Sequence, residues 1–365
     1  MSAYTVGLDV HSKKSTYVIQ NDSGQVVGKG EIPTTFEGLE RFKLRHKLPG
    51  GTVVGLETGN VSFFVSRVLQ ALELEPIVID AQEVRRKAHR PHIKSDTRDA
   101  YEICDGLRRD IYRSVVHVPP VEIAEVRELL SRRRHFVRVR TAEINAAKRF
   151  LRAIGLGRLV AHRTLRTESA WQKLLDLLVD ESVTTHIKRH LLVWRTAHQQ
   201  VKELDLELNE QPSAIDKDVR RLQTIPGVGP IVALTAVAVF SDVTRFPDAK
   251  HASSYGGLAP KTNQSGDRNS EGGISKRGSA ELRAMLCEAA QHARRPHHPL
   301  NPYFSKLSAK RGHRIAVVAV AHRLCRIIFA MLRDGAEFDE NKLNIERGPF
   351  TRKTTRLYRL KSSGT

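Results

Sequence analysis

Alternating apolar and polar positions predict the elements in the first third of the chain. Residues 4–10 alternate and are rich in β-formers, and residues 14–20 are predicted as the hairpin partner of this strand. An Asn-Asp-Ser-Gly turn follows at 21–24, and residues 26–32 form a third strand. The other predicted elements are strands at 51–57 and 76–80 and helices at 36–47, 61–72 and 96–109. A three-stranded meander followed by alternating helices and strands predicts an α/β domain of the RNase H-like class over residues 1–115.

Apolar residues at heptad spacing predict a long helix after the Val-His-Val-Pro-Pro sequence at 116–120, whose prolines end the first domain. The heptad positions are Ile123, Leu130, Val137, Ile144 and Leu151. A second helix carries apolar residues three or four apart, at Ile187, Leu191, Trp194, Val201 and Leu208. The two helices pair either as a hairpin within one chain or between subunits, and we favour a dimer contact. This helical coiled-coil region covers residues 121–212.

A glycine-rich turn between two helical runs marks the rear of the chain. Residues 219–233 predict a helix, a tight turn and a second helix, which resembles a helix-hairpin-helix. Gly227 and Gly229 would let the backbone approach a phosphate, and helix-start N–H groups would meet its charge. The alternative is a plain connector between packed helices. Residues 315–333 predict an amphipathic core helix, so we expect a mainly α domain over residues 213–340 and a loose basic tail over 341–365.

Charge is distributed unevenly along the chain. The 365 residues carry a net charge of +20, yet residues 1–110 hold 16 Lys and Arg against 15 Asp and Glu. Nearly all the positive excess therefore lies behind residue 110, which indicates a polyanionic partner for that part. Five arginines, with no acid among them, form a dense patch on the predicted long helix and favour a DNA or RNA backbone over a solvated charged face. They are Arg132, Arg133, Arg134, Arg138 and Arg140.

Composition also bounds the class of protein. A hydrophobic content of 40% excludes wholesale disorder, and the length predicts two or three domains. The three cysteines lack metal-ligand spacing and indicate a reducing compartment. We expect a cytoplasmic protein without a signal peptide or membrane contact, since the most apolar stretch, 225–240, is shorter than a spanning helix. His297 and His298 lie between prolines without a third ligand, so we expect them in a surface loop.

Four carboxylates occur at the ends of predicted elements in the front domain. Asp9 lies on the first strand, Glu57 ends a later strand, and Asp96 and Asp99 are three residues apart at a helix start. Strand ends and one helix face can gather such acids at one sheet edge, where they repel each other unless cations neutralise them. Oxygen ligands of this kind select Mg²⁺ or Mn²⁺, which could assist phosphodiester transfer. Taken singly, each acid is ordinary, and Asp96 could simply cap its helix.

A polar loop is predicted over residues 261–268, ahead of a helix that begins near Ala280. Ser265 precedes a glycine there, so it could approach a phosphate unhindered. Arg268, Lys276 and Arg277 lie nearby in the sequence and could offset negative charge on a reacting phosphate. The alternative for Ser265 is an ordinary turn residue.

These motifs together resemble a known family, the "DEDD" transposases of the insertion-sequence family called IS-one-ten, relatives of the Piv DNA invertase. The front motifs are Asp9 in Gly-Leu-Asp-Val, Glu57 in Glu-Thr-Gly, and Lys94-Ser-Asp-Thr-Arg-Asp-Ala. The rear motifs are Ile225-Pro-Gly-Val-Gly-Pro, Tyr255-Gly-Gly-Leu-Ala-Pro, Gln264-Ser-Gly and Ile274-Ser-Lys-Arg-Gly. The resemblance runs from about residue 4 to 335. Ser95 stands where many relatives have threonine.

The resemblance implies a RuvC-like front domain and a C-terminal transposase domain. Asp9, Glu57, Asp96 and Asp99 would be Mg²⁺ ligands, and Ser265 would attack DNA and hold a covalent phosphoserine link. Neighbouring serines that could take this place are Ser253, Ser254 and Ser270. Family members act as homodimers and homotetramers in the bacterial cytoplasm, on the nucleoid. A noncoding bridge RNA pairs with donor and target DNA and guides them.

Three functions therefore stand side by side. The first is an RNA-guided DNA transposase with Mg²⁺ and a serine nucleophile. The second is a RuvC-like structure-specific endonuclease, of the junction-resolving type, that uses metal-activated water. The third is a non-catalytic nucleic-acid-binding protein with structural acids. A DDE-type transposase is disfavoured because all four acids lie before residue 100.

Overall fold

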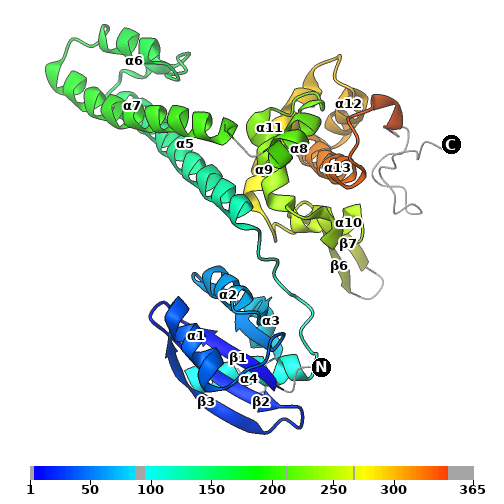
Figure 1. Ribbon diagram of the computed structural model, residues 1–365. Coiled ribbons are helices and arrows are strands. Elements are labelled where there is room, and N and C mark those ends of the chain that lie inside the picture. The colour runs from blue at the N-terminus through cyan, green and yellow to red at the C-terminus, as the bar shows by residue number, and fades with distance from the viewer. Residues whose placement is uncertain (1–3, 88–94, 211–212, 266–267, 344–365) are drawn as a thin grey trace. The chain divides into compact units, whose positions relative to one another are not determined.

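The computed structural model describes residues 4–87, 95–210, 213–265 and 268–343 (Figure 1). The chain divides into two compact units, Met1–Pro119 and Pro120–Thr365, which we call the front unit and the rear unit. The division falls at the two prolines that the sequence marks as the end of the first domain. Each unit is described by itself.

A five-stranded mixed sheet forms the centre of the front unit. Its strands are β1 (Tyr4–Val10), β2 (Lys14–Asn21), β3 (Val26–Pro33), β4 (Val53–Glu57) and β5 (Glu75–Ile79). The order in the sheet is β3-β2-β1-β4-β5. The first three strands pair antiparallel, whereas β1, β4 and β5 pair in parallel. The predicted strands are confirmed, with ends that shift by one or two residues.

Helices cover both faces of this sheet. Leu8 and Leu56 are fully buried in one core with residues of α1 (Phe36–Arg45) and α2 (Ser62–Ala71). The opposite face carries α4 (Asp96–Arg108), which contacts β1, β2 and β4. A short helix, α3 (Ala81–Lys87), was not predicted from the sequence. The prediction of an α/β front part is confirmed.

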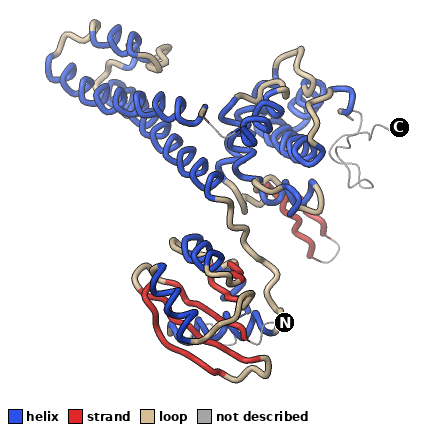
Figure 2. The backbone as a smooth tube through the Cα atoms, in the orientation of Figure 1, coloured by secondary structure: helices blue, strands red, loops and turns tan. Residues whose placement is uncertain are grey.

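A long helical hairpin opens the rear unit (Figure 2). Its arms are α5 (Val121–Ala153) and α7 (Glu181–Asn209), which run side by side, and η1 (Gly157–Val160) and α6 (Glu168–Leu175) join them. Leu151 of α5 is buried with Leu191 and Trp194 of α7. The apolar stripes therefore pack on each other within one chain, and not between subunits as we favoured, because heptad spacing identifies a stripe but not its partner.

Helices also form the core of the rest of the rear unit. They are α8 (Ser213–Gln223), α9 (Pro230–Phe240), η2 (Val243–Arg245), α10 (Ala249–Tyr255), α11 (Ala280–Ala290), η3 (Gln291–Arg294), α12 (Asn301–Arg311), α13 (His313–Asp334) and η4 (Glu340–Lys342). Val126 and Leu130 of α5 join this core, so the base of the hairpin is part of it. The predicted mostly helical remainder is confirmed.

The last long helix is the core helix that its amphipathic pattern predicts. By length and composition α13 could cross a membrane, but 72% of its most apolar window is buried inside the fold. It packs on α10, α11 and α12. Its burial by protein is the behaviour of a core helix in a folded domain.

The predicted polar loop at 261–268 is instead part of a β-hairpin of β6 (Pro260–Ser265) and β7 (Arg268–Ile274), apart from positions 266 and 267, which lie outside the described residues. Its sequence has no apolar alternation, so only backbone pairing defines it and the pattern could not reveal it. Two glycines fix the base of this hairpin. A Cβ on Gly278 would lie 2.1 Å from the carbonyl oxygen of Tyr255, and Gly257 has a φ of +68° that favours glycine.

Candidate active site

Two of the predicted acids stand on neighbouring parallel strands at one edge of the sheet. Leu8 pairs with Leu56 in the β1–β4 register, so the residues that follow, Asp9 and Glu57, lie at the same edge. Side chains alternate along a strand, which places Asp9 on the face of Gly7. That face is covered by α4, because a Cβ on Gly7 would lie 2.1 Å from the carbonyl oxygen of Ala100.

The helix α4 brings the other two acids to this edge. Its N-cap is Ser95, whose hydroxyl accepts a hydrogen bond from the Arg98 N–H at 3.3 Å. Because Ser95 caps the helix, Asp96 is released from the capping role that the sequence left open. Asp96 and Asp99 therefore occupy the first turn as predicted. Lys94 of the same motif lies outside the described residues.

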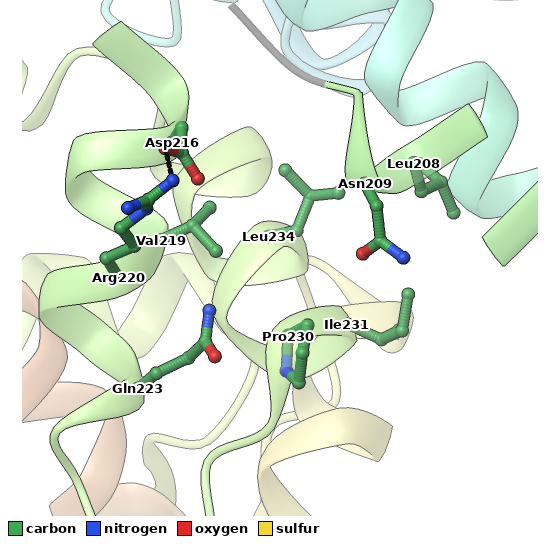
Figure 3. Close-up of a pocket in the computed structure, with 9 residues that line it drawn as sticks. All are labelled: Leu208, Asn209, Asp216, Val219, Arg220, Gln223, Pro230, Ile231 and Leu234. Atoms are coloured by element: carbon green, nitrogen blue, oxygen red, sulfur yellow. Dashed lines mark ion pairs between the residues drawn. The ribbon is translucent and has the colours of Figure 1, made fainter. Parts of the chain in front are cut away.

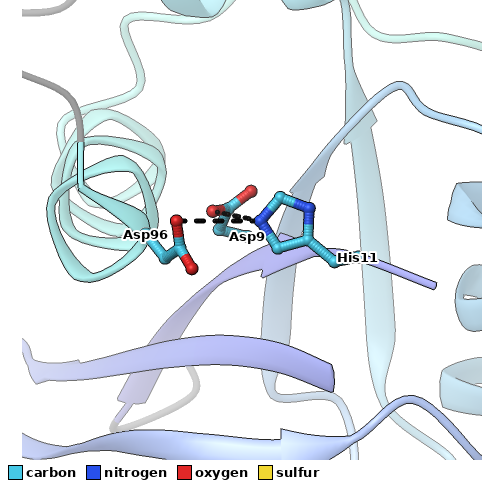
Figure 4. A group of neighbouring side chains, drawn as sticks. All are labelled: Asp9, His11 and Asp96. Atoms are coloured by element: carbon cyan, nitrogen blue, oxygen red, sulfur yellow. Dashed lines mark ion pairs between the residues drawn. The ribbon is translucent and has the colours of Figure 1, made fainter. Parts of the chain in front are cut away.

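A histidine that sequence reasoning missed completes the cluster (Figure 4). The His11 Nε2 atom lies 3.2 Å from Asp9 Oδ2 and 3.8 Å from Asp96 Oδ1. One potential ligand atom from each of these three residues lies within 4.8 Å of the other two. The i+2 spacing from Asp9 could have identified His11, since residues two apart on an extended chain share a face.

The electrostatics of the cluster favour a cation. Burial raises the pKa of Asp9, His11 lowers it, and the charges of Asp99 and Asp96 raise it further. Asp9 therefore resists ionisation among other acids, and its side chain is only 16% exposed. Carboxylate oxygens that converge under mutual repulsion are the donor set that a hard divalent cation requires. The residues present fit such an ion.

The predicted nucleophile belongs to the rear unit. Ser265 ends β6 and pairs with Arg268 across the β6–β7 ladder. At the base of this hairpin, Lys276 has a φ of +57°, an uncommon value for a residue with a side chain, and Arg277 follows it. The guanidinium of Arg283 donates to the Lys276 carbonyl at 3.4 Å. Lys276 and Arg277 therefore follow the end of the hairpin opposite to Ser265, and the five residues between the two ends of β6 span about 17 Å. The ladder brings Arg268 beside Ser265, but not these two residues.

Comparisons with known proteins identify the family of this chain. Residues 6–155 match the profile of DEDD transposases of the IS110 type, described as "Transposase", and residues 219–305 match "Transposase IS116/IS110/IS902 family". The transposase for insertion sequence element IS1111A of Coxiella burnetii (strain RSA 493 / Nine Mile phase I) is 31% identical over 266 residues, which cover 70% of this chain and 71% of that protein. This chain belongs to the IS116/IS110/IS902 family of transposases.

Further relatives extend this result. A probable family 20 transposase of Pseudomonas aeruginosa is 26% identical over 295 residues, which cover 77% of this transposase and 83% of that protein. The pilin gene-inverting protein of Moraxella lacunata is 29% identical over 181 residues, which cover 49% of this chain and 55% of that protein. The chain is therefore a DNA transposase, of the family that its motifs resemble.

The five predicted phosphate-binding arginines of the transposase do not act alike. Arg133 pairs with Asp205 of α7, and Arg140 lies 3.1 Å from His198, which stacks on Trp194. These two arginines hold the hairpin together. Burial raises the pKa of Glu281 in α11, and the nearby charge of Arg134 lowers it. Arg132 and Arg138 are exposed, so they are the members of the patch that a phosphate can reach.

The glycine-rich turn lies between α8 and α9, so the structure has the helix, tight turn and second helix that the sequence predicts. Gly227 has a φ of +84°, and a Cβ there would lie 2.8 Å from the His292 Cβ. Gly229, the N-cap of α9, faces open space. A cavity of about 270 Å³ lies beside it, between the end of α7 and the helices α8 and α9 (Figure 3). Of the two glycines, Gly229 is therefore the one that leaves room for a ligand.

A second histidine was also misread from the sequence. His298 is not in an exposed loop but is 8% exposed. Its Nε2 lies 2.9 Å from the Pro226 carbonyl oxygen, and its Nδ1 accepts the Leu300 N–H at 3.0 Å. The ring therefore donates from Nε2 and fixes the turn. Prolines around it indicated a loop, whereas the tertiary contact with Pro226 decides its burial.

Proposed function

We propose that this transposase cuts and rejoins DNA through a covalent phosphoserine intermediate on Ser265, at a RuvC-like domain that uses Mg²⁺ or Mn²⁺. The observation that carries the proposal is the acid cluster at the end of β1, whose members repel each other unless a cation joins them. The strand order β3-β2-β1-β4-β5 supports the RuvC-like assignment, since an antiparallel meander continued by parallel strands is expected of an RNase H-like domain.

The metal ligands are Asp9, Glu57, Asp96 and Asp99. Their carboxylate oxygens suit hard divalent cations, and all four come from one sheet edge and the helix start that faces it. A bound ion would offset negative charge on the oxygens of the reacting phosphodiester. His11 contacts Asp9 and Asp96 and orients their carboxylates for this role.

Ser265 attacks one phosphorus atom of the DNA backbone. The bond between its oxygen and phosphorus forms as the bond from phosphorus to one deoxyribose oxygen breaks; the serine gives up its proton and the released deoxyribose takes one. Attack by a hydroxyl of another strand reverses these steps, so exchange conserves the number of phosphodiester bonds. Arg268, which pairs with Ser265 in the ladder, offsets the negative charge of the transition state, whereas Lys276 and Arg277 follow the opposite end of the hairpin. The glycine-pinned base of the hairpin supports this role because it limits movement of the strand that carries Ser265.

A noncoding bridge RNA guides the enzyme to donor and target DNA, and the protein works as a homodimer or homotetramer. The positive excess behind residue 110 supports a nucleic-acid partner for the rear unit. The exposed Arg132 and Arg138 contact phosphates, and so does the backbone at Gly229. Acids of one subunit act on DNA that is linked to Ser265 of another.

Covalent trapping tests the nucleophile. The protein, with any RNA that accompanies it, is incubated with Mg²⁺ and labelled DNA that spans the junction of the element, and is then denatured in detergent. We expect a labelled adduct for the wild type and none for Ser265→Ala or Asp9→Ala, while Ser270→Ala keeps the adduct. Cut DNA without any adduct, lost only in Asp9→Ala, would identify a nuclease that uses metal-activated water.

Two further assays test the guide and the shared site. Ribonuclease treatment of the purified protein should abolish site-specific exchange, and full activity after that treatment would exclude an RNA guide. Mixing inactive Asp9→Ala and Ser265→Ala subunits should restore part of the exchange, since each supplies what the other lacks. No recovery from mixed assemblies would show that both groups act within one subunit.

A further inference from the structure

An acid-free stretch of the rear unit forms a basic surface that the proposed function does not use. From Ala289 to Arg333 the chain has no Asp or Glu but nine Lys and Arg. Two of these, Arg323 and Arg326, are buried on α13. The exposed cationic residues of the stretch that concern us come from the η3 loop, the end of α12 and the start of α13. They are Arg294, Arg295, Lys310 and Arg314, which we call the η3 surface.

Hydrogen bonds and packing connect the segments that carry these residues. The Gln291 side chain of η3 lies 3.2 Å from His313 Nε2 at the first residue of α13. The His313 ring also packs edge-on against Phe304 of α12, with centroids 5.6 Å apart. The Asn301 amide donates to the Ala293 and Arg294 carbonyls at 3.0 and 3.2 Å. The η3 loop is therefore held against α12 and α13.

The same loop braces the glycine-rich turn on its other side. His298 bonds to the Pro226 carbonyl, and His292 lies against Gly227. Burial lowers the pKa of His298, and the charge of Arg295 lowers it further, which places Arg295 near the turn. The η3 surface is thus continuous with the turn whose Gly229 faces open space.

No carboxylate among the described residues of the rear unit forms an ion pair with the η3 surface. None of the ion pairs among the described residues of the rear unit involves Arg294, Arg295 or Arg314. Cationic side chains held together without acids repel each other, and an external polyanion relieves that repulsion. A backbone of regularly spaced phosphates is the polyanion that such a set fits.

We propose that the η3 surface binds the phosphate backbone of duplex DNA, next to the turn at Gly229. Duplex DNA is favoured over unpaired RNA because single strands are held mainly by stacking on exposed aromatic rings. The aromatic residues of α12, Tyr303 and Phe304, are 7% and 6% exposed and offer no such platform. The inference rests on the proposed function for its partner, DNA, but not on Ser265 or on the metal ligands.

The test measures how salt weakens binding of a labelled DNA duplex to the full-length protein without divalent ions. Two variants remove two charges each from the surface, Arg294→Gln with Arg295→Gln, and Lys310→Gln with Arg314→Gln. The matched control, Lys188→Gln with Arg189→Gln, removes two exposed charges from α7. In each surface variant, the plot of log affinity against log salt should become less steep by about 2, because one phosphate contact contributes about 0.9 to the steepness. Each variant should also bind the duplex roughly tenfold more weakly.

Two outcomes would overturn the proposal. One is a slope in both surface variants that equals that of the wild type and the control. The other is weaker binding of a structured RNA of equal charge with unchanged binding of the DNA duplex, which would assign the surface to RNA. Unfolding midpoints of the variants should match the wild type because all four positions are exposed. Failure of the proposed function would instead appear as an unchanged adduct in Ser265→Ala, so the two failures are distinguishable.

Discussion

The close approach of α4 to the sheet makes Gly7 the position where a single methyl group should disturb the acid cluster most. In Gly7→Ala the new Cβ would lie 2.1 Å from the Ala100 carbonyl oxygen, 2.6 Å from the Cys104 nitrogen and 2.9 Å from its Cβ. Ordinary contacts need about 3.5 Å, so α4 must move by more than roughly 1 Å. Two of the three clashes are with backbone, which cannot rotate away. Overpacking of this kind costs about 1–3 kcal/mol of folding free energy.

The same movement should weaken metal binding, because Asp96 lies on the first turn of α4 and moves with it. A tenfold loss of affinity would remove about 1.4 kcal/mol of metal-dependent stabilisation at saturating metal. Urea unfolding of the full-length protein, with and without Mn²⁺, measures both effects. Gly59→Ala is the matched control, since it lies just after Glu57 and no atom is within 4 Å of its Cβ. If Gly7→Ala unfolded like Gly59→Ala and kept its response to Mn²⁺, the argument that α4 positions the acids would fail.

Three further predictions address charge and capping. Burial raises the pKa of Asp9, so ionisation of this carboxyl group lowers the stability of the fold as pH rises above the ordinary pKa of 3.8. The Asp9→Asn variant should therefore have a higher unfolding midpoint than the wild type in EDTA at pH 7. The same variant should have no strand-exchange activity. The Arg127 guanidinium donates to the Ala238 and Val239 carbonyls at 2.8 and 3.2 Å. Arg127→Ala should therefore lower the free energy of unfolding, measured in urea, by about 2–4 kcal/mol. Arg132→Ala, at an exposed position, should lower it by less than about 1 kcal/mol. Burial lowers the pKa of His322 to about 4 from 6.5, so stability should be full above pH 6.5 and fall by up to about 3 kcal/mol as pH drops towards 4. Replacing it in His322→Leu should flatten that dependence, and an unchanged slope would contradict the assignment.

Sequence patterns alone determined the strands of the front unit, the long helices and the order of the acids, but neither α3 nor the hairpin of β6 and β7. Alternation, short apolar runs and turn residues identified the strands of the front unit, and the spacing of Asp96 and Asp99 placed both on one helix face. These are local properties, in which each residue's neighbours along the chain decide the outcome. The same holds for the glycine-rich turn, because a positive φ at Gly227 is a local requirement.

Tertiary structure decided which residues meet across the fold. The contact of His11 with Asp9 and Asp96 depends on how close α4 lies to β1, which the glycine at position 7 permits but which no spacing in the sequence expresses. The pairing of α5 with α7, and with it the loss of Arg133 and Arg140 from the free basic patch, follows from the packing of two stripes that could have paired elsewhere. Periodicity shows that a face is buried, but only the closed fold determines what buries it.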